Sequence, residues 1–137
     1  MKIYTEHLTL QSEKKREFMN ITPGIKAAME KSGLRDGIIL VSSLHSNAAI
    51  ILSDDEPGLL DDLQVWLEQT AAEREDYKHR GRFESNTGIH LQALLLNQQV
   101  TVGFSEGRVD LGPWQFVLFA ELDGQRPKRV LVKVIGE

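Results

Sequence analysis

The sequence contains no cysteine at any of its 137 positions. Disulfide bonds, thiolate zinc sites and cysteine nucleophiles are therefore excluded as sources of stability or chemistry. A metal ion in this protein would have to be held by imidazole and carboxylate groups. The absence of cysteine is also typical of proteins from a reducing compartment or a hot habitat.

Long apolar runs and basic tracts are missing as well. No apolar stretch approaches the roughly 20 residues that span a bilayer, and the first ten residues lack the apolar centre of a signal peptide. The formal net charge is −4 at pH 7, and no run of basic residues alternates with aromatic ones. We therefore expect a cytoplasmic protein whose partners include neither nucleic acid nor membrane.

The residues that are present give an ordinary globular composition, with 41% hydrophobic and 26% charged residues. This balance is far from that of a disordered chain. A chain of 137 residues is also of the usual size for one hydrophobic core. The sequence therefore predicts a single domain over residues 1–137.

Hydrophobic periodicity and turn residues predict about two helices and six to eight strands. The helices are expected over residues 23–32 and 59–73, with Thr22 as N-cap of the first and Gly33 as its end. Strands are expected at 3–10, 18–21, 38–43, 48–52, 100–104, 108–111, 114–121 and 129–135. Segment 48–52 is predicted to continue strand 38–43 or to pair with it, and 91–96 fits either a helix or a strand. Short turns join most of these segments, so the fold class is α+β, an antiparallel β-sandwich with helices packed on it.

Histidine is the first residue type that could carry chemistry. His45 ends a predicted strand, His79 lies in a polar stretch over residues 73–87, and His90 follows that stretch. No short metal-binding motif relates them, and each one alone is more typical of a structural or surface histidine. The polar stretch is longer than most connections, however, and loops of that length tend to be functional or disordered.

Carboxylates follow one of the strands. Asp54, Asp55 and Glu56 come directly after segment 48–52, and Asp62 lies in the next predicted helix. Their position before a helix is typical of caps and of partners for the helix dipole. A carboxylate near a histidine ligand is also what metal-activated water needs, so both interpretations stay open.

Basic, amide and aromatic residues form the last group. Arg80 and Asn86 lie in the polar stretch, where they could hold a phosphate or could simply be solvated. The basic residues from Arg126 to Arg129 flank a turn and are typical of surface charge. Trp114 follows Gly-Pro at the start of a strand, a position more often filled by a packing residue than by the wall of a pocket.

Three stretches of the chain together resemble the YjbQ family, which is often labelled thiamine-phosphate-synthase-like. LHSNAAIILSDDEPGLLDDL resembles the family pattern HTSAxLxxNExxDPxxxxDM, and YKHRGRFESNTGIHLQALLL resembles YxHN…NxxxHIxxxLLG. VGFSEGRVDLGPWQFVLFAELDGQRPKRVLVKVIG resembles VxxGRLxLGTWQGIxLxEHDGPRxRRVxxxxxG. The three stretches occur in the family's order and cover more than half of the chain.

The resemblance implies a compact, jelly-roll-like β-sandwich that assembles as a homotrimer. It also implies a site for a small phosphorylated metabolite or another anion. A secondary thiamine phosphate synthase activity, which is a transferase reaction, is associated with the family, whose physiological reaction is unsettled.

Site residues follow from the positions that match the family patterns. His45, His79 and His90 match the three histidines and are expected to bind a divalent metal ion, zinc, with one coordination position left open. Asp54 and Glu121 match acidic positions and are expected to transfer protons. Asn86, Arg80, Trp114 and Gln115 are expected to bind substrate, and Asp62 to support the site.

Departures from the family patterns leave some of these roles open. The acidic loop is one residue shorter than in the family, so Asp54 and Asp55 could exchange roles. Ser46 and Asn47 replace threonine and serine, and Arg80 replaces an asparagine. Three functions therefore stay open: a metal-dependent enzyme, a non-catalytic module that binds a metal or anion, and a protein whose histidines lie at a subunit interface.

Overall fold

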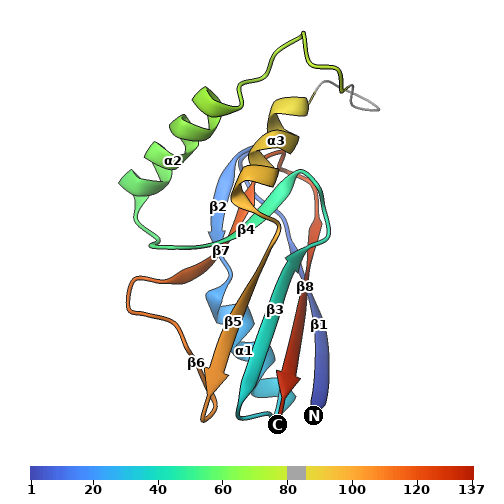
Figure 1. The fold of residues 1–137 in the computed structure, drawn as a ribbon, viewed down its shortest axis with the longest axis vertical. Helices are drawn as coiled ribbons and strands as arrows, with labels where there is room; N and C mark the ends of the chain where they lie inside the picture. The colour runs from blue at the N-terminus through green and yellow to red at the C-terminus, as the bar shows by residue number, and fades with distance from the viewer. Residues whose placement is uncertain (80–85) are drawn as a thin grey trace.

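The structure is a computed structural model that describes residues 1–79 and 86–137. In these residues eight strands form two antiparallel sheets, with three helices packed around them (Figure 1). The large sheet has the order β1 (Lys2–Leu10), β8 (Lys128–Gly136), β3 (Gly37–Ser43), β5 (Gln99–Ser105) and β6 (Arg108–Val109). The small sheet has the order β2 (Glu17–Asn20), β7 (Phe116–Glu121) and β4 (Ala48–Ser53). The helices are α1 (Thr22–Ser32), α2 (Pro57–Thr70) and α3 (Thr87–Leu96).

The main core joins one face of each sheet to α1. Alternation along β8 turns Val130, Val132 and Val134 to the same face, and all three are fully buried in this core. The opposite face of the small sheet is covered by α2, where Leu60 packs with Leu118 of β7. Both faces of the small sheet are therefore buried, which explains why β4 and β7 are almost continuously apolar.

Helix α1 begins differently from the sequence prediction. Thr22 is the first helical residue and not the N-cap, which is Ile21, and the Asn20 side chain accepts a 3.0 Å hydrogen bond from the Thr22 N–H. The Thr22 hydroxyl instead accepts a hydrogen bond of 2.8 Å from the backbone N–H of Val117 in the small sheet. Gly33 ends the helix in a left-handed conformation with φ 70°, as predicted.

Other elements also differ in extent or place from the sequence predictions. Residues 91–96 belong to α3, so the described residues contain three helices and not two. Helix α2 begins at Pro57, where the Glu56 carboxylate accepts two backbone N–H bonds, and it ends earlier than predicted, at Thr70. Strand β4 neither continues nor pairs with β3, because it lies in the other sheet beside β7.

The α+β class and the antiparallel sheets are confirmed. The jelly-roll topology remains a prediction. Among the described residues, no helix combines the length and the apolar character that crossing a membrane requires.

One end of the molecule collects the turns that carry most polar residues of interest. Direct connections from β1 to β2, from β3 to β4 and from β7 to β8 cross between the sheets there, and the last two of these crossings carry the residues of interest. Pairing of Ala48 with Glu121 and of Ser43 with Val130 fixes these crossings next to each other. Helix α3 lies over the same end (Figure 1).

Candidate functional site

The centre of the candidate site is a pair of histidines at the start of α3. The rings of His79 and His90 lie edge to face, with centroids 5.3 Å apart and planes at 80°. Thr87 of α3 holds His79 there, because its hydroxyl donates a hydrogen bond to the His79 carbonyl. Asn86 precedes the helix, and its carbonyl accepts a hydrogen bond from the His90 N–H. The structure therefore brings three of the predicted site residues together.

The ring of His90 is oriented by the crossing between the sheets. Its Nδ1 lies 3.3 Å from the carbonyl oxygen of Ser46. A carbonyl oxygen only accepts hydrogen bonds, so this contact requires the proton on Nδ1 and leaves the lone pair on Nε2. Histidines that bind metals are usually held in this way, with one nitrogen donating to a carbonyl and the other facing the ion.

His45 lies in the same crossing but is held differently. Its Nε2 accepts a 3.0 Å hydrogen bond from the backbone N–H of Arg129 at the start of β8. The neutral ring therefore carries its proton on Nδ1, and in this orientation it offers no lone pair to a metal ion. Burial lowers the pKa of His45, and the nearby Lys128 ammonium lowers it further.

A buried charge cluster, made of Glu121, Asp123 and Lys128, lies beneath the crossings. The Lys128 ammonium is 2.5 Å from a carboxylate oxygen of Glu121 and also donates to the Asp123 carbonyl. Arg126 and Asn47 both donate to the Asp123 carboxylate. Glu121 is only 2% exposed and already accepts from Lys128 and from a backbone N–H, so its carboxylate is engaged in holding the turn.

The arrangement fits a divalent metal ion at two of the three predicted ligands. Imidazoles on one tetrahedral zinc ion, with nitrogens at about 2 Å, have ring centroids about 5 Å apart, which matches the His79–His90 pair. His45 does not fit as it is oriented. Within the described residues, no three histidine, aspartate or glutamate side chains are grouped closely enough to hold a metal ion.

Asp54, Trp114 and Gln115 lie at the other end of the small sheet. Asp54 follows β4 and Gln115 precedes β7, and the pairing of Ser53 with Phe116 places both far from the crossings. The length of β4 alone is about 17 Å. Trp114 is 72% exposed, and the Gln115 side chain accepts a hydrogen bond from Gly112 in its own turn. Asp62 lies exposed on α2. Arg80 lies outside the described residues.

Comparisons with known proteins identify the family. A model of the family described as "UPF0047 protein YjbQ-like" matches residues 6–137. The chain belongs to the YjbQ family. It is similar to a UPF0047 protein of Methanothermobacter thermautotrophicus, with 39% identity over 100% of this chain and 95% of that protein. It is also similar to the crystal structure of a protein of unknown function from Sulfolobus solfataricus, with a TM-score of 0.93, 30% identity and 99% of each chain covered. A YjbQ/UPF0047 structure from Clostridium acetobutylicum gives a TM-score of 0.88 and 31% identity over 95% of this chain and 99% of that one.

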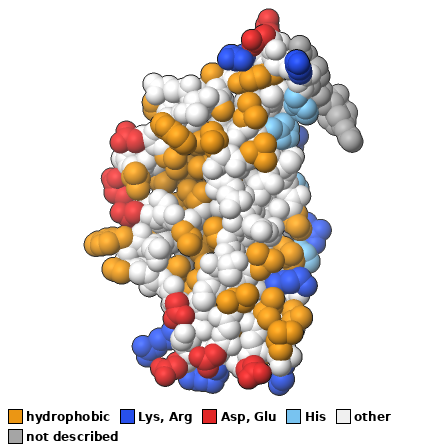
Figure 2. All heavy atoms as spheres, in the orientation of Figure 1, with side chains coloured by type: hydrophobic (Ala, Val, Ile, Leu, Met, Phe, Trp, Pro, Cys, Tyr) orange, Lys and Arg blue, Asp and Glu red, His pale blue; other side chains and the backbone are white. Residues whose placement is uncertain are grey.

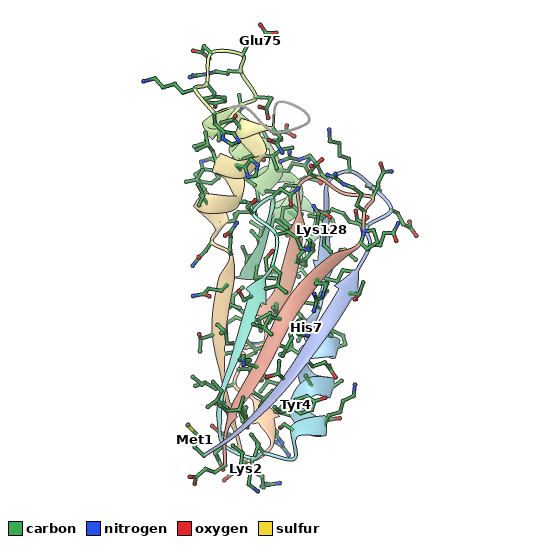
Figure 3. The ribbon with its side chains drawn as sticks, turned by 90° about the vertical axis from the view of Figure 1, so that its right-hand side faces the viewer. Met1, Lys2, Tyr4, His7, Glu75 and Lys128 are labelled. Carbon is green, nitrogen blue, oxygen red and sulfur yellow. The ribbon has the colours of Figure 1, made fainter. Side chains whose placement is uncertain are left out.

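The buried charge cluster of this YjbQ-family chain is the feature that sequence reasoning missed. Lys128 belongs to a run of basic residues interpreted as surface charge, yet it is 3% exposed. Its alternation with Val130, Val132 and Val134 was a usable signal, because it places Lys128 on the buried face of the strand. Figure 3 shows Lys128 nearer than His7 to the end of the sheet that α3 covers.

The lowered pKa of His45 predicts a pH dependence of stability in this YjbQ-family protein. Because the folded state binds the proton more weakly than the unfolded state, this contribution is complete above the unfolded value of about 6.5 and is lost as the pH falls through the folded value. Wild type should therefore lose more stability between pH 7.5 and 5.5 than the variant His45→Gln. Urea unfolding at both pH values tests this, with His7→Gln as control. Equal losses in wild type and His45→Gln would contradict the prediction.

Proposed function

We propose that this protein binds a divalent metal ion, zinc, through His79 and His90 and acts on a small phosphorylated metabolite. One observation carries the proposal. His90 is held by the Ser46 carbonyl with the Nε2 lone pair available, and the His79 ring lies beside it at the spacing of two ligands on one ion. A fixed His90 tautomer together with this ring spacing serves metal binding. Two rings that only pack against each other need no fixed tautomer.

The surroundings supply groups for an anionic substrate. Arg126 lies in the turn between β7 and β8, and its side chain is 63% exposed. Arg129 is exposed beside His45. Guanidinium groups bind phosphoryl oxygens through charge-assisted hydrogen bonds. A bound divalent ion supplies Lewis-acid polarisation of a phosphoryl oxygen. The role of this chain's own residues is then to hold the phosphoryl group at that end of the molecule.

Metal titration of purified protein tests the proposal. Zinc affinity, measured by calorimetry after chelator treatment, should fall in His90→Ala and in His79→Ala by more than about 100-fold, the upper range for loss of an outer-sphere partner. His7→Ala is the matched control, because His7 lies exposed on β1, away from this end (Figure 3). Equal zinc affinity in His90→Ala and His7→Ala would refute the metal site.

A non-catalytic binding module is the second candidate, and the placement of the acids favours it. Glu121 is paired with Lys128, and Asp54 lies at the far end of β4 in the same copy. Turnover assays separate the two candidates. The concrete enzymatic version is thiamine phosphate synthase activity, assayed with a pyrimidine diphosphate and a thiazole phosphate. Metal binding without turnover of any phosphorylated compound in a broad panel would favour the binding module.

We propose that the protein is a homotrimer. Asp54, Trp114 and Gln115 lie far from the histidine pair of their own chain, so assembly would give them a functional role. In a ring that joins unlike surfaces, the far end of one copy meets a different surface of the next, so these residues could complete a neighbouring site. Hydrophobic side chains gather over α2 and α3 (Figure 2), and Leu94 is 68% exposed.

Light scattering tests the assembly. The mass should be three times that of the 15.5 kDa chain, and Leu94→Ser should reduce it because a polar side chain weakens an apolar contact. Ile3→Ser, which changes an exposed residue of β1, is the control and should keep the full mass. A monomeric wild-type protein at micromolar concentration would contradict the homotrimer.

A further inference from the structure

A cavity lined by both charged and apolar side chains lies beside α3. Its volume is about 390 Å³, and its walls come from the loop before β2, from α2 and from α3. The basic residues Lys15 and Arg16 face the acidic residues Glu68 and Glu73 across it. Ile89 and Gln92 of α3 are buried and form its floor.

Arg16 is the most unusual group in this cavity. Its guanidinium donates from Nη2 to the side-chain oxygen of Gln92, which is 3% exposed and is itself fixed by a 3.0 Å bond to the Ala71 carbonyl. The Nε atom is buried and has no hydrogen-bond partner among the described residues. Burial also lowers the pKa of Arg16. A buried donor without a partner costs free energy, so a ligand that accepts from Nε would be stabilised there.

The two acidic residues of the cavity do not satisfy this donor. Both carboxylate oxygens of Glu73 lie 3.1 Å from the backbone N–H of Gly88 at the start of α3. Glu68 comes closest, with an oxygen 3.7 Å from Nε, which is too long for a hydrogen bond. Its side chain is 51% exposed and rotates into solvent at little cost. Glu68 therefore shows that a carboxylate can approach the Nε of Arg16. It does not occupy the hydrogen-bonding position at that atom.

We propose that this cavity binds a small oxyanion, the carboxylate or phosphate group of a metabolite, on the Nε edge of Arg16, with Glu68 displaced. The Nε–H donates at the edge of a guanidinium that stays charged, and a charged N–H is a strong donor to carboxylate and phosphate oxygens. Gln92 holds the guanidinium in place, so the site is formed before the ligand arrives. The ammonium group of Lys15 adds positive charge at the rim.

Titration with inorganic phosphate and, separately, with acetate tests the proposal. Binding is followed by calorimetry and by perturbation of NMR signals from the side chain of Arg16, in the presence of a chelator so that no metal contributes. Arg16→Gln should weaken the affinity of the better probe at least about tenfold, because charge-assisted hydrogen bonds are lost. The preferred probe identifies the chemical class of the ligand.

Glu68→Gln is the decisive variant, because it changes an exposed side chain and leaves the fold intact. It removes a competing charge and should raise the affinity for the probe several-fold. Glu30→Gln, an exposed change on α1, alters the net charge equally and should leave the affinity unchanged. His90→Ala should bind the probe as wild type does, which separates this cavity from the histidine pair. The proposal is overturned if neither probe saturates the protein, or if Glu68→Gln and Glu30→Gln bind equally.

Discussion

Replacing Lys128 with methionine should lower the free energy of unfolding by about 3–5 kcal/mol. Lys128 is 3% exposed, and its ammonium group lies 2.5 Å from the carboxylate of Glu121, which is 1% exposed as a side chain. Methionine fills a similar volume but carries no charge. The carboxylate would then remain buried without its cation, and such a group costs far more than the net contribution of the pair itself.

The backbone around the pair adds to this effect. Lys128 also donates a 2.9 Å bond to the Asp123 carbonyl, and the Asp123 N–H donates to Glu121. These bonds fix the turn between β7 and β8, which carries Arg126 and leads to Arg129 in β8. Loss of the ammonium group should therefore loosen this end of the molecule as well as destabilise the fold.

Urea unfolding at pH 7 measures the change. Lys133→Met is the matched control, because Lys133 lies on the same strand and is only partly buried, and it should change stability by less than about 0.5 kcal/mol. The double variant Glu121→Gln/Lys128→Met should recover much of the loss, because it removes the unpaired charge. If Lys128→Met and Lys133→Met unfold at the same urea concentration, the pair has no structural importance.

Most strands and the helices α1 and α2 were predictable because their side chains follow local periods. β8 alternates along its whole length, and α1 ends at the glycine that the sequence indicates. The assignment of β4 was not predictable in this way. A buried apolar strand has the same pattern in either sheet, and only the pairing with β7 decides which sheet it joins.

The candidate site was predictable in part for a similar reason. His79 and His90 flank one loop, so the start of α3 brings them together, and both could be named from the sequence. His45 was named too, but its orientation depends on the Arg129 N–H, 84 residues away. The separation of Asp54 from His45 follows from the strand between them, whose two ends lie about 17 Å apart, so the predicted strand already implied it.

Phe119→Ala should also be strongly destabilising, by about 3–5 kcal/mol, because it empties the centre of the main core. Phe119 is fully buried on β7, between Met19 of β2 and Ile50 of β4. Its ring faces the large sheet and α1, so truncation removes contacts from both sheets and from the helix at once. β7 is the central strand of the small sheet and is paired on both sides, which limits how far it can move to close the cavity.

Phe18→Ala provides the comparison for this prediction. Phe18 pairs with Ala120 on the neighbouring strand but is only partly buried, under α2. Because α2 contacts the small sheet on one face only, it can shift to fill the space, and the cost should be about half as large. Urea unfolding of both variants measures the difference. Equal losses of stability would mean that α2 is held as rigidly as the main core. The surface over α2 and α3 that is proposed to contact a second copy would then not be free to adjust.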